Sequence, residues 1–300
     1  MLYNRLSSFL KEKYGEKIQR LPINAGFTCP NKTGDKGTAG CIYCETSGSG
    51  FAAVESHVPI EEQIRVMIKR YENVAKKFMA YFQANTNTFA PVHVLKSLYD
   101  QSLCDDRIEI LDISTRPDCV NEDILDLIAS YLKKVDVYLE FGVESTNTQT
   151  LKFMNRGHYL SDVIKSVLMA KKKRIEVILH FILDFPTDSI DDVIEMAKFC
   201  NVLNVDGVKL HSLYIAENSQ LGLLYKENLF SPLSMEEYIE RTVTFLQYLS
   251  PKVVIHRMVA EPPHKGTLHG NWGISKAKLL HLIELEMKKN NRFQGQFYKK

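Results

Sequence analysis

The chain has 300 residues, of which 45% are apolar and 25% are charged, so it contains enough apolar material for one large core or two small ones. This composition excludes a disordered chain. Lys and Arg total 38 against 36 Asp and Glu, and the resulting net charge of +2 permits nucleic acid as a partner without demanding it.

No segment predicts a membrane span or a secretory signal. The longest apolar run, around 177–183, is interrupted by His180 and is far shorter than the roughly 18 residues that a span requires. Residues 1–13 alternate apolar and charged side chains and lack the unbroken apolar core of a signal peptide. We therefore expect a cytoplasmic protein, with no membrane partner, whose six cysteines stay reduced.

Short β-branched runs alternate with amphipathic segments along the chain, which is typical of βα units around a parallel sheet. Most of the runs are continuously apolar, as expected when both faces of a sheet are covered. We predict strands at 21–27, 79–83, 108–114, 136–143, 175–183, 205–214 and 252–259.

Amphipathic periodicity predicts a helix over 60–78, where Ile64, Ile68, Tyr71, Ala75 and Phe78 recur at alternating spacings of four and three residues. Their shared face is expected to pack on the sheet.

Capping residues mark the starts of later helices. Asn121 precedes one helix, Ser189 precedes a second, and Ser234 with Glu237 forms a capping box at the start of a third. A repeat of about 30 residues favours a closed or partly closed βα barrel, although a doubly wound open sheet has the same local pattern. In both folds, ligands bind at the carboxyl ends of the strands.

Three of the cysteines, Cys29, Cys41 and Cys44, fall within sixteen residues directly after the first strand. The loop contains Gly34, Gly37 and Gly40, which permit positive φ and let the chain wrap three sulfurs around one centre. Three thiolates bind an iron–sulfur cluster or a metal ion, and a four-iron cluster held by three cysteines has one iron left for an exogenous ligand.

Two other interpretations of this loop stay open. Cys41 and Cys44 have zinc-knuckle spacing, and Cys29 with His57 could complete a structural zinc site in a non-catalytic binding protein. The three thiols could also be buried together by coincidence. A thioredoxin-like pair is set aside because it leaves Cys29 unexplained.

The cysteine loop, with aromatic Tyr43 just before its last cysteine, resembles that of the radical S-adenosylmethionine (SAM) enzymes, in a wide-spaced form with eleven residues between the first two cysteines. Residues 15–270 are most similar to the YhcC/YtqA-type branch, which is related to the radical domain of the Elongator catalytic subunit. The resemblance implies a partial (β/α)6-type TIM barrel with an additional C-terminal strand and helix. Residues 1–20 are then an N-terminal extension, 21–215 the barrel core and 216–300 a C-terminal extension.

The resemblance also implies the cofactors and the chemistry. Cys29, Cys41 and Cys44 are expected to hold a [4Fe–4S] cluster whose open iron chelates the amino and carboxylate groups of SAM. An electron from a flavodoxin- or ferredoxin-type reductant then cleaves SAM to methionine and a 5′-deoxyadenosyl radical. The protein is expected to position the cofactor and to exclude water and oxygen.

Motifs at the ends of strands two and three imply SAM contacts. Gln83 and Asn85 lie where the family has a Gly-Gly-Glu-like turn, and they are expected to substitute for it together with backbone carbonyls. Ser114 and Arg116 belong to a Ser-Thr-Arg-Pro-Asp stretch similar to that of the Elongator branch. The alternative role for Asn85 and Ser114 is helix capping.

Motifs at the next two strands add three more expected cofactor-binding residues. Glu144 in Gly-Val-Glu-Ser is expected to reach the ribose hydroxyls, and Arg156 in Asn-Arg-Gly-His to pair with the methionine carboxylate. His180 begins a stretch in which Asp184 replaces a family glycine, and the adenine is expected nearby. A surface ion pair between Glu144 and Arg156, and a core position for His180, are the alternatives.

Candidate substrate contacts follow the last two strands. We expect substrate binding or proton transfer from Lys209, His211, Tyr214 and Glu261. The remaining cysteines could hold a second cluster or donate hydrogen, although Cys200 lies on the apolar stripe of a helix; these are Cys104, Cys119 and Cys200.

Relatedness to the Elongator branch suggests a modified uridine at a tRNA wobble position. The basic run 171–174 and the tail residues Lys288, Lys289, Arg292, Lys299 and Lys300 could contact phosphates. The alternatives are helix-dipole compensation for the run and a solvated tail.

Overall fold

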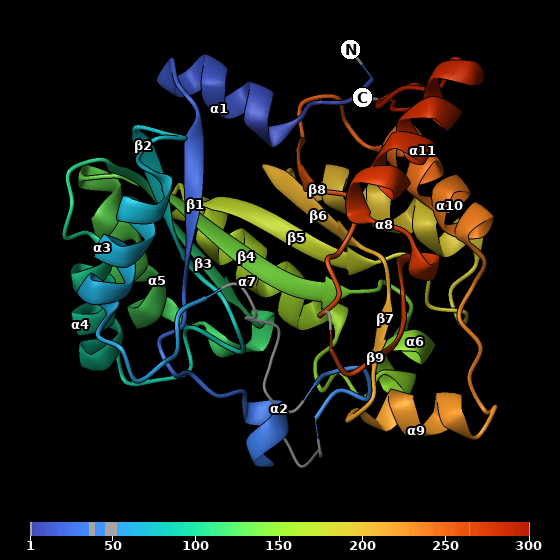
Figure 1. Ribbon diagram of the computed structural model, residues 1–300, viewed down its shortest axis with the longest axis horizontal. Helices are drawn as coiled ribbons and strands as arrows, with labels where there is room; N and C mark the ends of the chain where they lie inside the picture. The colour runs from blue at the N-terminus through green and yellow to red at the C-terminus, as the bar shows by residue number, and fades with distance from the viewer. Residues whose placement is uncertain (1, 36–39, 46–52, 264, 300) are drawn as a thin grey trace.

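The structure is a computed structural model that describes residues 2–35, 40–45, 53–263 and 265–299. Within these residues, seven parallel strands form one sheet whose spatial order follows the chain order, without the reversal of a doubly wound sheet. They are β1 (Ile18–Ile23), β2 (Lys77–Phe82), β3 (Ile108–Thr115), β4 (Asp136–Glu144), β5 (Glu176–Ile182), β6 (Gly207–His211) and β8 (Val254–Arg257). The sheet curls, but its edge strands β1 and β8 do not pair, so the fold is a partial barrel as predicted (Figure 1).

Helices cover the outer face of this sheet (Figure 1). The outer layer consists of α3 (Ile60–Tyr71), α4 (Val92–Ser102), α5 (Glu122–Ser130), α7 (Leu160–Lys172), α8 (Ile190–Val202) and α10 (Met235–Tyr248). The predicted additional C-terminal strand and helix are β8 and α11 (Lys276–Lys289). Helix α1 (Leu6–Tyr14) lies beside the gap between the two edge strands, where Arg5 forms an isolated bridge with Ile255.

Smaller elements lie near the carboxyl ends of the strands (Figure 1). A two-stranded antiparallel sheet forms there from β7 (Tyr214–Ala216) and β9 (Thr267–Gly270). Three short helices complete this end: α2 (Pro30–Thr33), α6 (Thr148–Phe153) and α9 (Gln220–Lys226). The loops at this end, which carry function in barrel proteins, therefore contain secondary structure that stabilises them.

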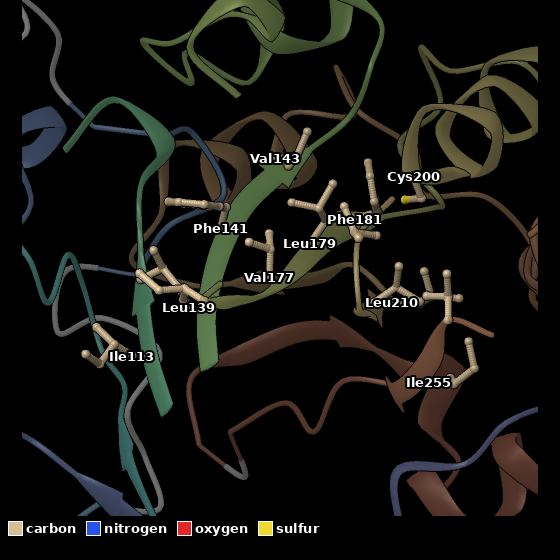
Figure 2. Packing of buried hydrophobic residues seen from close by; sticks show 14 of the residues in the cluster. Ile113, Leu139, Phe141, Val143, Val177, Leu179, Phe181, Cys200, Leu210 and Ile255 are labelled. Atoms are coloured by element: carbon tan, nitrogen blue, oxygen red, sulfur yellow. The ribbon is translucent and has the colours of Figure 1, made fainter. Parts of the chain in front are cut away.

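The main hydrophobic core lies between the sheet and the outer helices. In Figure 2 the side chains of Leu139, Phe141 and Val143 from β4 lie together with Leu179 and Phe181 from β5. All five are fully buried. Burial of such side chains stabilises a fold by about 1.5–3 kcal/mol each, so this layer holds the sheet in place.

The predicted helix over 60–78 is wrong in its second half. Helix α3 ends at Tyr71, whose carbonyl accepts hydrogen bonds from the backbone of Val74 and Ala75 in the following turn. Phe78 lies in β2 and is fully buried there. The spacing misled because a helix stripe and the start of a buried strand are both apolar and follow one another closely.

The first and sixth predicted strands have clearly different limits in the structure, and helix α4 is among those that were not predicted. The first strand is β1, which ends before Gly26, a residue with a φ of 72°. The run 205–214 divides into β6 and the start of β7, which pairs with β9 rather than continuing the barrel. Helix α4 carries Leu95 and Tyr99 on its buried face, an i, i+4 pair that could have revealed it.

The predicted helix starts are confirmed. The side chain of Asn121 accepts from the backbone of Ile124, and Ser189 caps α8 with a capping box. Ser234 and Glu237 form the predicted box at α10. In the part of the chain that the structure describes, no helix combines the length and the apolar character needed to cross a bilayer.

Candidate functional site at the carboxyl ends of the strands

The cysteine loop starts at Cys29, which directly precedes α2, and it is tied to distant parts of the chain. The backbone of Ile42 donates to the carbonyl of Met154 at 3.0 Å and accepts from Leu221 of α9 at 2.7 Å. The side chain of Asn155 donates to the carbonyl of Gly40 at 2.7 Å. These bonds fix the loop against α6 and α9.

The predicted glycine conformations are confirmed where they can be seen. Gly34 and Gly40 have φ values of 87° and 95°, in the left-handed region that favours glycine. Gly37 lies outside the described residues. The two glycines let the chain turn back so that Cys41 returns to the same cavity as Cys29.

Polar groups surround the three thiols. The side chain of Asn31 donates to the sulfur of Cys41 at 3.2 Å, and Arg156 Nη1 lies 3.5 Å from the same sulfur. Burial raises the pKa of Cys29, but the Thr86 hydroxyl and the charges of Arg116 and Arg156 outweigh it and leave this pKa below its ordinary value. Such donors and cations favour thiolates, the form that binds metal.

The described residues do not form the set of ligands that the zinc interpretation requires. Among the described residues, no three His, Cys, Asp or Glu side chains are arranged to hold one metal ion. His57, the expected fourth ligand, is 76% exposed and lies 3.3 Å from Glu55. Because Zn–S bonds are about 2.3 Å long, zinc requires its sulfur ligands within about 4 Å of one another.

One cavity brings together all ten residues predicted for the site. It opens at the carboxyl ends of the strands, where the barrel geometry places ligands. Its lining includes Cys29, Cys41, Cys44, Gln83, Asn85, Ser114, Arg116, Glu144, Arg156 and His180. Residues up to 151 positions apart in the sequence, Cys29 and His180, thus face one space.

The turn after β2 has an unusual backbone. Ala84 and Asn85 have φ values of 76° and 58°, so two residues with side chains adopt a conformation that glycine adopts at little cost. The amide of Asn85 donates to the carbonyl of Phe27 at 2.8 Å and accepts from Lys32 at 3.2 Å. Asn85 therefore ties this turn to the cysteine loop, and it caps no helix.

Glu144 and Arg156 form a buried pair at the end of β4, which excludes the surface-pair alternative. Their side chains are 12% and 8% exposed, with Arg156 Nη2 lying 3.4 Å from Glu144 Oε1. Burial raises the pKa of Glu144, although Arg156 opposes this. Gly142 makes room for the pair, since a Cβ there would lie 2.6 Å from both groups.

Arg116 is buried and makes a bidentate pair with Asp118, at 2.9 and 3.1 Å. Its Nη1 atom is buried without a hydrogen-bond partner in the described residues, and so is Nε of Arg156. Unsatisfied buried donors are costly, so both guanidinium groups have unused capacity for an anionic or polar ligand.

A buried carboxylate that sequence reasoning missed, Glu140, organises the floor of the cavity. It accepts from Ser114 at 2.6 Å, lies 3.1 Å from His180 Nε2, and pairs with Lys209. Burial opposes ionisation, but the Lys209 ammonium holds the pKa of Glu140 well below its ordinary value. The signal in the sequence is an acid in the middle of an otherwise apolar strand, which demands a buried partner.

The same network includes two of the predicted residues, His180 and Lys209. Burial lowers the pKa of His180 to about 4, so its ring is neutral near pH 7 and bonds to Glu140 as a satisfied core histidine does. Lys209 is 1% exposed and belongs to this network rather than to the lining of the site cavity. Ser114 bonds to Glu140 and caps no helix.

The other candidate substrate contacts do line the site cavity: His211, Tyr214 and Glu261. The His211 ring lies against Arg257, with 3.0 Å between Nη2 and Nδ1. Arg257 lines the cavity too and was not predicted, because a charged residue ending a strand carries no local signal of its own.

The structure does not bring the other three cysteines together. Cys104 is exposed, Cys200 is fully buried in the core (Figure 2), and Cys119 lines a separate cavity with Pro30 and Phe89, near the starts of α4 and α5. None of them lines the site cavity.

A parallel partial barrel with three thiols and a ring of polar groups at the carboxyl ends of its strands defines a class of barrel enzymes with the ligand site at that rim. Comparison with protein families identifies the class further. The Radical SAM superfamily model matches residues 31–200, and the Radical SAM C-terminal domain model matches residues 205–289. The first match covers more than half of the chain, which therefore belongs to the radical SAM superfamily.

Curated relatives span nearly the whole chain. An uncharacterized protein of Methanocaldococcus jannaschii is 31% identical over 98% of this chain and 92% of its own length. YtqA of Bacillus subtilis is 29% identical over 99% of this chain and 93% of its own length. Human Elongator complex protein 3 is 23% identical over 69% of this chain, which spans only 39% of that relative.

Solved structures share the fold. The archaeal Methanocaldococcus infernus Elp3 superposes with a TM-score of 0.69 at 20% identity, covering 92% of this chain and 64% of that structure. SuiB of Streptococcus suis, solved with SAM bound, superposes with a TM-score of 0.50 at 13% identity, covering 86% of this chain and 54% of that one. The relationship of this chain to YhcC/YtqA-type proteins and to Elongator, predicted from its motifs, is confirmed.

Proposed function

We propose that this protein binds a [4Fe–4S] cluster through Cys29, Cys41 and Cys44 and cleaves SAM reductively. The observation that carries the proposal is that these three thiols line the same cavity as the polar residues ending four successive strands. A coincidental grouping of thiols does not account for the donors aimed at Cys41 or for the lowered pKa of Cys29.

The residues around the thiols suit a cluster. Asn31 and Arg156 direct N–H groups at the Cys41 sulfur, and hydrogen bonds to cluster sulfurs tune the reduction potential. Burial raises the pKa of Cys44, and Lys32 opposes it. A reduced cluster bound there supplies the electron that divides SAM into methionine and a 5′-deoxyadenosyl radical.

SAM fits the remaining polar groups of the cavity. The buried Nε of Arg156 lacks a partner among the described residues, and a guanidinium suits the methionine carboxylate. Glu144 has a positive φ of 74° at a bulge in β4, which turns its carboxylate toward the lining and makes it our candidate for the ribose hydroxyls. Gln83 and the backbone of Ala84 and Asn85 are our candidates for the SAM amino group.

The finer features of this proposal concern partners and substrate. A flavodoxin- or ferredoxin-type protein in the cytoplasm is our candidate reductant. Similarity to the Elongator proteins, and to a tRNA uridine(34) acetyltransferase of Methanocaldococcus infernus that is 31% identical over 49% of this chain, supports a tRNA uridine as substrate. This chain spans only 28% of that acetyltransferase.

Three of the basic residues that suggested phosphate contacts are already paired, and Lys300 lies outside the described residues. Lys171 bonds to Asp206, and Lys173 to Glu122 and Asp126. Arg292 in the tail pairs with Glu240. These three side chains are therefore less available for phosphate, and the predicted phosphate contacts fall to the other basic residues of the two segments.

The test is metal content and SAM cleavage in anaerobically purified protein. We expect about four iron and four sulfide per chain and, with dithionite and SAM, formation of 5′-deoxyadenosine. Changing Cys29, Cys41 or Cys44 singly to Ala should reduce both to background, whereas Cys104→Ala, at an exposed cysteine outside the cavity, should leave both unchanged.

Two outcomes contradict the proposal. One is colourless wild-type protein with a single zinc per chain, and the other is a cysteine variant with undiminished iron and SAM cleavage. Stimulation of 5′-deoxyadenosine formation by bulk tRNA, but not by tRNA digested with ribonuclease, tests the substrate class.

A further inference from the structure

A second cavity lies at the open edge of the barrel. Because β1 and β8 do not pair, the space between them is not filled by sheet, and a cavity of about 620 Å³ occupies it. Its walls come from β1 and β8, from Leu6 and Leu10 of α1, and from Lys276 and Leu280 of α11.

This edge cavity adjoins the site cavity. The two share the side chains of Tyr81, Gln83, Arg257 and Glu261 in their linings. Gln83 is our candidate for the SAM amino group, so a molecule in the edge cavity would lie next to the proposed SAM site. The edge cavity therefore has the position that a substrate requires.

The lining of the edge cavity is strongly basic. It contains five basic side chains and one acidic side chain, in a protein whose net charge is only +2. They are Arg5, Arg20, Lys209, Arg257 and Lys276, with Glu261 as the single acid. A concave wall with one dominant sign of charge concentrates ligands of the opposite sign.

Some of this positive charge is neutralised inside the protein. Lys209 is paired with Glu140, and Arg5 with Glu284 at 2.6 Å. Arg20 Nε lies 3.8 Å from Asp112, too far for a hydrogen bond. Lys276 is 3.7 Å from Glu261, whose side chain is 72% exposed, so this pair is weak.

Arg257 has no acidic partner among the described residues. In the described part of the chain its guanidinium hydrogen-bonds to the His211 ring, and its Nε is buried without a hydrogen-bond partner there. Burial and the charge of Arg257 lower the pKa of His211 well below its ordinary value, so the ring is neutral and cannot balance the charge. Burying a charge without a counter-ion is costly, and a bound anion removes that cost.

We propose that Arg257 and Lys276 bind an oxyanion, a phosphate or carboxylate group, of a substrate that enters the edge cavity between β1 and β8. The role as substrate site rests on the proposed SAM chemistry, whereas the anion site itself rests on the charges and contacts above. The planar fork of Arg257 is expected to give most of the affinity, and Lys276 to add a flexible second charge at the mouth.

The test is calorimetric titration of cluster-reconstituted protein, saturated with SAM and without reductant, with three probes: inorganic phosphate, malonate and an RNA stem-loop. Saturating SAM prevents the probes from binding at the proposed site for the methionine carboxylate of SAM. We expect Arg257→Gln to weaken binding of the recognised probe by at least about tenfold, because a charged hydrogen bond is lost. Lys276→Gln should weaken it by about threefold, and Arg257→Lys should restore part of the affinity.

Lys198→Gln is the matched control, since it removes one positive charge from the exposed face of α8, away from both cavities. Preference for malonate identifies a carboxylate, preference for phosphate a small phosphorylated molecule, and much tighter binding of RNA a polynucleotide. Should Arg257→Gln fail to fold, Lys276→Gln carries the test, because its side chain is 42% exposed.

The inference is overturned if no probe binds at millimolar concentration, or if both cavity variants bind as wild type or lose no more affinity than the control. Protein that cleaves SAM but fails in this way overturns the anion site alone. Protein that binds the probes through Arg257 but neither binds nor cleaves SAM overturns the proposed function alone.

Discussion

The two faces of the barrel sheet carry different kinds of side chain. On β4, Val137, Leu139 and Phe141 face the helices and belong to the main apolar core. The intervening Tyr138 and Glu140 belong to the inner face. Alternation along one strand thus separates a layer that only stabilises the fold from an interior that carries charge.

The inner face has a network of charges within its apolar surroundings. Glu140, Lys209 and Asp112 are all essentially unexposed. Burial and the charge of Glu140 raise the pKa of Asp112 well above its ordinary value. The outer-facing residues of β4 are all apolar, and a charge placed among them would find no partner in that apolar layer. The difference shows that the barrel interior accommodates charged groups where they can pair with one another.

Breaking the inner network should have the largest effect on stability. Glu140→Ala leaves the Lys209 charge buried without its partner, and we expect a loss of about 3–5 kcal/mol in the free energy of unfolding. Urea denaturation followed by circular dichroism measures it. The double variant Glu140→Leu with Lys209→Met removes both charges and should lose distinctly less. Equal losses in the two variants would contradict the account of the network.

Truncation in the outer layer should cost less than loss of the network, at the same depth of burial. Leu139→Ala creates a cavity between the sheet and the helices, and we expect a loss of about 3 kcal/mol. Since no charge is involved, this loss should be the same at pH 5 and pH 8 in urea titrations. A loss that changes with pH would show that the two faces are coupled.

Asp184 differs from the paired charges of the inner face, because it is a buried acid with no ion pair in the described part of the chain. Burial raises its pKa to about 7, although the backbone of Leu213 donates to it. The unfolded chain releases this proton near pH 4, so the folded state binds more protons between about pH 4 and pH 7. Stability contributed by this group is therefore present at low pH and is lost as pH rises through that window.

The measurement is the difference in unfolding free energy between wild type and Asp184→Asn at several pH values. Asn keeps an acceptor for Leu213 but cannot ionise. We expect wild type to lose stability relative to the variant by at most about 1.4 kcal/mol per pH unit from pH 4 to 7, and no further above pH 7. Asp188, whose pKa burial raises to about 6, is present in both proteins and cancels. A flat difference would contradict the raised pKa.

Local patterns were sufficient for most of the fold. All seven barrel strands were predicted from apolar runs, and the caps at Asn121, Ser189 and Ser234 were predicted because the hydrogen bonds involved span only three residues. The errors fell where apolar residues continue past the end of an element, as between Tyr71 and Phe78. Periodicity alone does not mark where such an element stops.

The site was predictable where its residues have local signatures. The three cysteines share one loop, and Glu144 and Arg156 lie in recognisable motifs, so all were found before the structure. Glu140 and Arg257 were missed because their importance depends on partners far along the chain, Lys209 and His211. The left-handed turn at Ala84 and Asn85 was hidden for another reason, since neither residue is glycine.

By itself the sequence determined the order of strands and helices, the cysteine loop and membership of the radical SAM superfamily, because these depend on periodicity and on short motifs. Only the tertiary structure decided which side chains meet at the open edge between β1 and β8, where basic side chains from both edges line the gap. The physical reason is that the charge and the burial of a site depend on which residues the fold brings together, not on their separation along the chain. Arg20 and Arg257 share one cavity although 237 positions separate them along the chain.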